Sequence, residues 1–149
     1  MTDSPRRDEL AARLAAVRER ISAACEAAGR KPQDVTLVAV TKTFPASDVR
    51  LLSGLGVRDF GENRDAEAAP KAAQCADLDL VWHFVGQLQT NKAASVARYA
   101  TFVHSVDRLR LVRTLGAAAR RRLRPAARQR RRRASGPAGR HRDLGRHER

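Results

Sequence analysis

The segment Val35–Thr43 (VTLVAVTKT) constrains this chain most, because a short apolar run of β-branched residues ends on a lone lysine, Lys42. Turn-forming residues precede the run at 31–34 and Pro45 follows it, which predicts a strand covered on both faces, as in the interior of a parallel sheet. Side chains alternate along a strand, so Lys42 shares a face with the alternate valines and lies at the C-terminal end. In parallel α/β folds, catalytic and ligand-binding residues lie at the C-terminal ends of the strands. From its position alone, however, Lys42 is more simply interpreted as a surface lysine that ends a strand.

Helix and strand patterns alternate along the rest of the chain. Helices are predicted from Ser4 to about Gly29 and then at 47–55, 90–99 and 64–75, the last of which Pro70 should kink or divide. The predicted strands end near four residues: Lys42, Gly61, Val85 and Val106. These ends are about twenty residues apart, the length of one strand-plus-helix unit, which predicts parallel βα repetition.

Two architectures fit this repetition, an open doubly wound sheet and a closed (β/α)8 barrel. Periodicity does not separate them. No glycine-rich phosphate-binding motif follows the first predicted strand, which argues against a nucleotide-binding open sheet.

Charge is distributed very unevenly along the 149 residues, which carry a formal net charge of +14. Residues 1–112 hold 16 Lys and Arg against 14 Asp and Glu, whereas residues 113–149 hold 14 Arg, no Lys and two acidic residues. Cys25 and Cys75 have neither disulfide-framework nor zinc-site spacing, so no metal is expected. With no apolar leader and no segment long enough to cross a membrane, the sequence predicts a cytoplasmic protein without a membrane partner.

Polar residues near the other strand ends supply the candidate site. An amine that attacks an aldehyde must be neutral, and apolar walls such as Val38 and Val40 would keep water away from it. Asn63, His83 and Ser105 are predicted to face the same site as Lys42, at the C-terminal ends of the strands. His104 is next to Ser105 in its strand and should point the opposite way, toward the helices. A turn asparagine, a core histidine and a capping serine are the simpler interpretations of these residues.

Four ordered motifs together resemble the pyridoxal phosphate homeostasis protein family: AVTKTFP (39–45), FGENR (60–64), WHFVGQLQTNK (82–92) and HSVD (104–107). The resemblance implies a barrel similar to the N-terminal domain of alanine racemase, with pyridoxal 5′-phosphate held as a Schiff base on Lys42. It also implies that Asn63 and His83 lie beside the cofactor ring. Family members resemble cofactor carriers or regulators, and a racemase is disfavoured because no second acid/base residue can be identified.

The resemblance stops near Leu115. We therefore expect residues 1–115 to form the first four βα units of a partial (β/α)8 barrel, and residues 116–149 to be an Arg-rich tail, largely disordered apart from helix through 117–122. The tail is either a nucleic-acid-binding arm or the product of a shifted reading frame. We favour the frameshift, because Arg, Ala, Gly and Pro share GC-rich codons and the break falls inside a good match.

Two functions follow as hypotheses. The first is a pyridoxal phosphate binding protein of intracellular cofactor homeostasis, impaired in this copy by truncation. The alternative is a basic nucleic-acid-associated protein that acts through its Arg-rich tail without sequence preference. Resemblance supports the first hypothesis, whereas composition alone supports the second.

Overall fold

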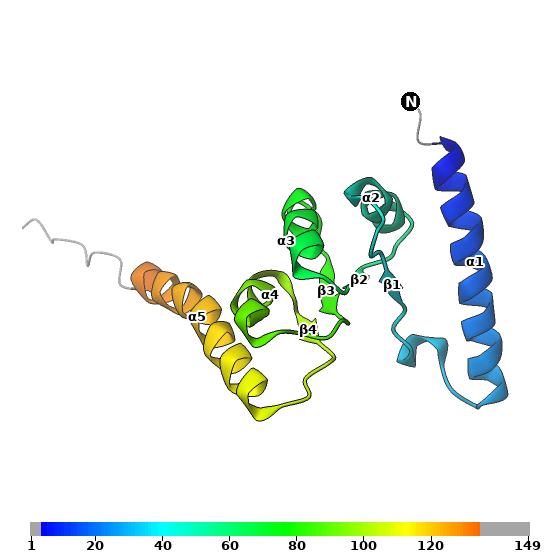
Figure 1. The fold of residues 1–149 in the computed structure, drawn as a ribbon. Coiled ribbons are helices and arrows are strands. Elements are labelled where there is room, and N and C mark those ends of the chain that lie inside the picture. The colour runs from blue at the N-terminus through cyan, green and yellow to red at the C-terminus, as the bar shows by residue number, and fades with distance from the viewer. Residues whose placement is uncertain (1–3, 135–149) are drawn as a thin grey trace, which may run out of the picture.

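The structure, a computed structural model, describes the backbone of residues 4–134 and the side chains of residues 5–122. Its elements alternate between helices and short strands (Figure 1). In chain order they are α1 (Ser4–Ala27), η1 (Pro32–Asp34), β1 (Val38–Val40), α2 (Ala46–Gly54), β2 (Asp59–Glu62), α3 (Asp65–Gln74), β3 (Val81–Phe84), η2 (Thr90–Lys92), α4 (Ala93–Tyr99), β4 (Phe102–Val103) and α5 (Leu109–Ala134).

The four strands form one parallel sheet in the order β1-β2-β3-β4. Figure 1 shows the strands following one another across the molecule, from β1 on the side of α1 to β4 on the side of α5. Single hydrogen bonds extend the ladders beyond the short strands, such as the bond from the Thr41 N–H to the Gly61 carbonyl (3.0 Å). The predicted parallel βα repetition is confirmed.

One face of the sheet carries the hydrophobic core. Phe60 and Trp82 occupy paired positions on β2 and β3 and pack with buried residues from α1, α2 and α3. Phe84, two residues beyond Trp82 and on the same face, packs in a second cluster with Val96 of α4 and Leu111 of α5. The helices that supply these residues therefore cover a single face.

The opposite face of the sheet is open. Val40 is 49% exposed and Phe102 is 52% exposed, although both are large apolar residues. A doubly wound sheet reverses its strand order and places helices on both faces, whereas a barrel winds in one direction with helices outside. The sequential strand order and the one-sided core therefore identify a partial barrel, as predicted.

β1 differs from its prediction. It was expected to be an interior strand covered on both faces, but among residues 4–134 it pairs with β2 alone and forms an edge of the sheet. It is also shorter than the predicted run. An apolar β-branched segment satisfies either position, so the sequence pattern could not distinguish an interior strand from this edge strand.

Two helices also differ from expectation. α3 continues through Pro70, which does not divide it. α5 crosses residue 115 and continues to Ala134, beyond the predicted helix at 117–122. The expected boundary at 115/116 therefore does not coincide with the end of an element, and the part of the predicted tail at 135–149 lies outside the described residues.

Within the described part of the chain, no helix combines the length and the hydrophobicity needed to cross a membrane.

We predict that removing an aromatic ring from the two faces has unequal effects. Phe60→Ala should lower the free energy of unfolding by about 3–5 kcal/mol, because Phe60 is fully buried. Phe102→Ala, the matched control on the open face, should cost about 1 kcal/mol, because its ring is already half exposed. Denaturant unfolding followed by Trp82 fluorescence would measure both. Equal losses would contradict the one-sided core.

Candidate functional site

Lys42 lies on a tight turn that leaves the C-terminal end of β1. The Phe44 N–H donates to the Thr41 carbonyl (3.1 Å), so Lys42 and Thr43 are the two central residues of a four-residue turn. The side chain of Lys42 is exposed. Within the described residues no hydrogen bond or ion pair engages its amine, which leaves the amine available to a ligand.

The turn adopts an unusual backbone conformation at Thr43, whose φ is +67°. A positive φ at this position is typical of type II turns, which favour glycine there. A β-branched residue in this region costs roughly 1–3 kcal/mol and persists when its surroundings enforce it. The Thr43 N–H donates to Oε1 of Glu67 (2.6 Å), which supplies one such restraint.

A buried polar cluster lies beside the turn. Nζ of Lys71 donates to the Thr41 carbonyl (2.8 Å), to Oε1 of Glu62 (2.6 Å) and to Oε1 of Glu67 (3.0 Å). The Thr41 hydroxyl also donates to Oε1 of Glu62 (2.7 Å). Lys71 and Glu62 are 5% and 0% exposed, so their opposite charges are paired out of contact with bulk water. We call Thr41, Glu62, Glu67 and Lys71 the turn cluster.

Glu67 is the more accessible carboxylate of the turn cluster. The hydrogen bond from Lys71, followed by that from the Thr43 N–H, holds the pKa of the Glu67 carboxyl below its usual value of 4.5. Burial opposes this shift, and the nearby charges of Lys71 and Arg64 support it. Glu67 therefore remains an ionised acceptor for the turn at neutral pH.

Asn63 follows β2 and approaches the loop after β3 closely. A Cβ added to Gly86 would press on the Asn63 carbonyl oxygen and lie 2.8 Å from its Cα. Real Cβ contacts are not this short, so glycine is required at position 86 for the two backbones to meet. Beside them lies a pocket of about 320 Å³, lined by Asn63, Arg64, Asp65, Ala66, Phe84, Gln87, Leu88, Gln89 and Lys92.

His83 is buried on the face of the sheet that carries Gly61, its register partner in β2. Its Nε2 lies 2.8 Å from Oδ1 of Asp59, and its Nδ1 lies 2.9 Å from Nε2 of His104. A carboxylate accepts hydrogen bonds, so Asp59 favours a proton on Nε2 of His83. In neutral His83, Nδ1 then accepts from His104, and the ring is held in one tautomer.

The register places three of the four predicted site residues on one face. Val40 pairs with Gly61, which pairs with His83, so strand alternation carries Lys42 and Asn63 to the same side beyond Val40 and Gly61. His83 lies one layer deeper in the sheet.

Ser105 and His104 occupy the reverse of their predicted positions. Val103 pairs with Phe84 on the helix-covered face, so alternation assigns Ser105 to that face as well. The Ser105 hydroxyl donates to the Val85 carbonyl (3.2 Å). The prediction that His104 faces the helices is wrong, because its ring stacks on His83 with centroids 5.2 Å apart. Which residues of a strand face the helices depends on how the strand pairs with its neighbour, and the sequence of β4 alone did not reveal that pairing.

The expected dry environment of the Lys42 amine is absent. Lys42 is exposed, and Val40, one of the two valines expected to exclude water, is 49% exposed. The physical reason is the sparse packing of this face of the sheet near β1, where Val40 is half exposed, whereas His83 farther along the face is buried.

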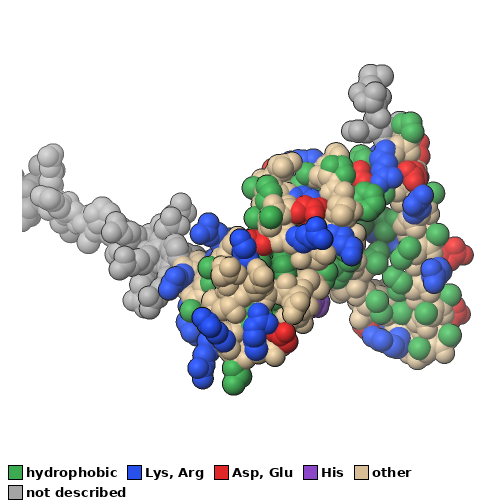
Figure 2. Space-filling view, viewed as in Figure 1, with side chains coloured by type: hydrophobic (Ala, Val, Ile, Leu, Met, Phe, Trp, Pro, Cys, Tyr) green, Lys and Arg blue, Asp and Glu red, His purple; other side chains and the backbone are tan. Residues whose placement is uncertain are grey.

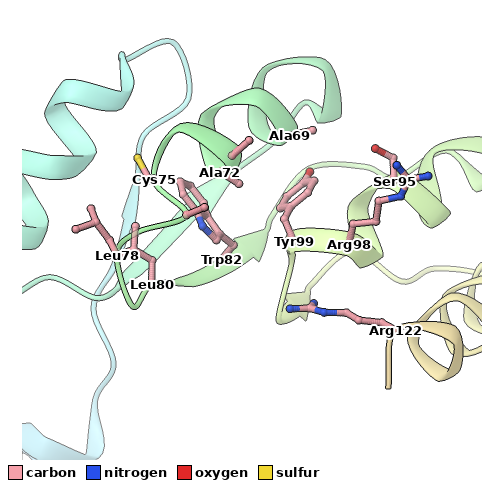
Figure 3. A pocket seen from close by; sticks show the side chains of 12 residues that line it. Ala69, Ala72, Cys75, Leu78, Leu80, Trp82, Ser95, Arg98, Tyr99 and Arg122 are labelled. Carbon is pink, nitrogen blue, oxygen red and sulfur yellow. The ribbon is translucent and has the colours of Figure 1, made fainter. Parts of the chain in front are cut away.

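A larger groove of about 510 Å³ lies elsewhere, between α3, α4 and α5 (Figure 3). Trp82 and Tyr99 line it, and the guanidinium of Arg122 reaches toward it from α5. Trp82 belongs to the helix-covered face, so this groove lies on the other side of the sheet from Lys42.

Sequence reasoning missed the turn cluster. Glu67 and Lys71 are separated by four residues, a spacing that places them on one side of a helix and predicts an ion pair. This ion pair could therefore have been predicted from the sequence. The contacts of Lys71 with Thr41 and Glu62 could not, because they join residues that are 30 and 9 positions apart in the sequence.

No family model matches the chain. Curated relatives that match the chain are named pyridoxal phosphate homeostasis protein. The protein from Pseudomonas aeruginosa is 49% identical over 106 residues, which cover 71% of this chain and 46% of the relative. The Mycobacterium leprae protein is 45% identical over 119 residues, which cover 74% of this chain and 46% of the relative. The Escherichia coli protein is 42% identical over 111 residues, which cover 72% of this chain and 47% of the relative.

The aligned part of this chain is homologous to the pyridoxal phosphate homeostasis proteins. The chain spans about half the length of these curated relatives. Among solved structures, PipY from Synechococcus elongatus with pyridoxal phosphate bound matches with a TM-score of 0.57 and 39% identity, covering 66% of this chain and 47% of PipY. An unknown protein from Bifidobacterium adolescentis matches with a TM-score of 0.72 and 32% identity, covering 82% of this chain and 54% of that protein.

We predict that Gly86→Ala displaces the backbone of Asn63 and destabilises the protein by about 2 kcal/mol or more, since a rigid backbone opposes the new methyl group. Gly54→Ala is the matched control, because a Cβ at Gly54 meets nothing within 4 Å. Thermal unfolding and amide chemical shifts around Asn63 would measure the effects. Equal stability of the two variants would contradict the close approach.

We also predict that Glu67 titrates below pH 4.5. Its pKa is lower in the folded than in the unfolded chain, so its contribution to stability is complete above the unfolded value and is lost as the pH falls through the folded value. The stabilising bonds should therefore persist at pH 5 and weaken only below about pH 4.5. Carboxyl carbon chemical shifts measured by NMR would give the midpoint, and a midpoint above 4.5 would contradict the role of Lys71.

Proposed function

We propose that this chain binds pyridoxal 5′-phosphate through a Schiff base on Lys42 and serves pyridoxal phosphate homeostasis as a cofactor-binding protein. The observation that carries the proposal is the homology to proteins of that name, together with an exposed amine that has no partner among the described residues at the C-terminal edge of a parallel sheet. The bound cofactor in PipY supports the choice of ligand.

The chemistry of the residues fits this cofactor. Pyridoxal phosphate would supply an aldehyde, a group that a neutral amine such as that of Lys42 can attack as a nucleophile. The Lys42 ammonium must first lose a proton to the solvent. Its exposed position on the turn gives the amine access to both the aldehyde and the water that accepts this proton.

Asn63 and His83 are the proposed neighbours of the cofactor ring. Both share the face of Lys42, and the contacts of His83 with Asp59 and His104 hold its ring in place. We do not extend the proposal to Ser105, because its register assigns it to the other face of the sheet.

Binding by this chain should be weak and reversible. The open face leaves Lys42 and Val40 in contact with water, so a Schiff base at this position would be exposed to hydrolysis. No reaction beyond binding is proposed, since no second acid/base residue for a racemase was identified. A cytoplasmic location remains a prediction.

The nucleic-acid hypothesis receives no support from the comparisons. Basic side chains gather over α5 (Figure 2), and those described are the exposed arginines Arg110, Arg113, Arg120, Arg121 and Arg122. A basic helix surface accounts equally well for solvation of an exposed helix. Binding to nucleic acid therefore remains untested, and we do not propose it as the function.

We predict that borohydride reduction in the presence of pyridoxal phosphate places the adduct mainly on Lys42. Peptide mass spectrometry would locate it. Lys42→Ala should remove this adduct and its absorbance without unfolding the chain, because the side chain has no partner among the described residues. Lys31→Ala, which replaces another exposed lysine, should leave the adduct unchanged. Modification predominantly at Lys31, Lys71 or Lys92 would refute the assignment.

A further inference from the structure

The turn cluster contacts the backbone on both sides of Lys42. Lys71 donates to the carbonyl of Thr41, the residue before Lys42, and Glu67 accepts from the N–H of Thr43, the residue after it. Lys71 and Glu67 also bond to each other (3.0 Å). One ion pair on α3 thus spans the residue that carries the amine.

We propose that Glu67 is a positioning residue that, with Lys71, fixes the turn around Lys42 so that the amine is presented to pyridoxal phosphate. The proposal rests on the proposed function for its ligand. It assigns no contact between Glu67 and the cofactor, and Glu67 acts through the backbone of Thr43.

The conformation of Thr43 shows why such a restraint is needed. A φ of +67° is disfavoured for a β-branched residue, so a free chain would leave this conformation readily. The bond from the Thr43 N–H to the Glu67 carboxylate is charge-assisted and short (2.6 Å). Loss of this bond should therefore release the turn and change the direction of the Lys42 side chain.

The charges of the turn cluster make Glu67 suitable for mutation. The cluster holds one ammonium and two carboxylates, and the buried pair is Lys71 with Glu62. The side chain of Glu67 is 32% exposed. Removing Glu67 leaves that oppositely charged pair intact, so Glu67→Ala should fold, whereas removing Lys71 would leave the Glu62 carboxylate buried without its partner.

A general structural role of Glu67 is the competing explanation. Glu67 lies in the first turn of α3, where a negative charge stabilises the helix dipole. Glu67→Gln separates the two explanations, because it removes the charge and keeps a side-chain oxygen that can accept from Thr43. A positioning role requires the glutamine variant to rescue the turn, whereas a dipole role requires it to behave like alanine.

Hydrogen exchange at the Thr43 amide tests the turn directly in the chain without added ligand. Glu67→Ala should accelerate this exchange roughly tenfold or more, the loss expected for a hydrogen bond to a charged group. Glu67→Gln should remain within roughly threefold of the parent, consistent with a retained neutral hydrogen bond. Glu19→Ala, an exposed substitution on α1, is the matched control and should have no effect.

The second measurement is the yield of borohydride-trapped adduct on Lys42 at fixed pyridoxal phosphate concentration, for the same variants over a range of pH. Glu67→Ala should reduce the yield several-fold and Glu67→Gln should restore it, in parallel with Thr43 exchange. Unchanged exchange and unchanged yield in Glu67→Ala would overturn the proposal, as would a glutamine variant that matches alanine. An absence of any Lys42 adduct in the parent chain would instead refute the proposed function, and Thr43 exchange would still decide whether Glu67 holds the turn.

Discussion

The buried ion pair between Lys71 of α3 and Glu62 of β2 is the interaction on which the candidate site depends. Burying two charges is costly, and the pair is favourable only when its geometry is good and further hydrogen bonds satisfy it. Here the Nζ–Oε1 distance is 2.6 Å, and Thr41 adds a hydroxyl donor and a carbonyl acceptor. Oε2 of Glu62 has no partner among the described residues. The pair thereby joins α3 to the ends of β1 and β2, next to Lys42.

The second determinant is the asymmetry of the sheet. Parallel strands connected in sequential order bring their helices to one face, and the buried aromatic residues Phe60, Trp82 and Phe84 all point there. The face that carries Lys42, Asn63 and His83 is packed much less completely. The helix-covered face of the four strands therefore stabilises the fold, whereas the other face remains accessible to a ligand. This explains how the Lys42 amine can be exposed beside a well-packed core.

Much of the fold could be predicted because its signals are local. Alternating apolar runs and helical periodicity identified the βα units, and the ordered motifs around Lys42, Asn63, His83 and His104 indicated the family to which the curated relatives belong. Side-chain direction was predicted less well. Ser105 and His104 were interchanged, because the facing of β4 is set by pairing Val103 with Phe84. The polarity of both neighbours is compatible with either face, so the sequence carried no signal to decide between them.

The sequence by itself determined the order and type of the elements, the homology of the aligned part to the pyridoxal phosphate homeostasis proteins and the position of Lys42 just beyond the end of a strand. Only the tertiary structure decided that β1 is an edge strand, that one sheet face is open and that Lys71 is a buried partner of Glu62 and Glu67. The physical reason is the range of the forces involved. Periodicity reflects contacts within one element, whereas strand pairing, burial of charge and the restraint on Thr43 arise between segments that meet only when the chain has folded.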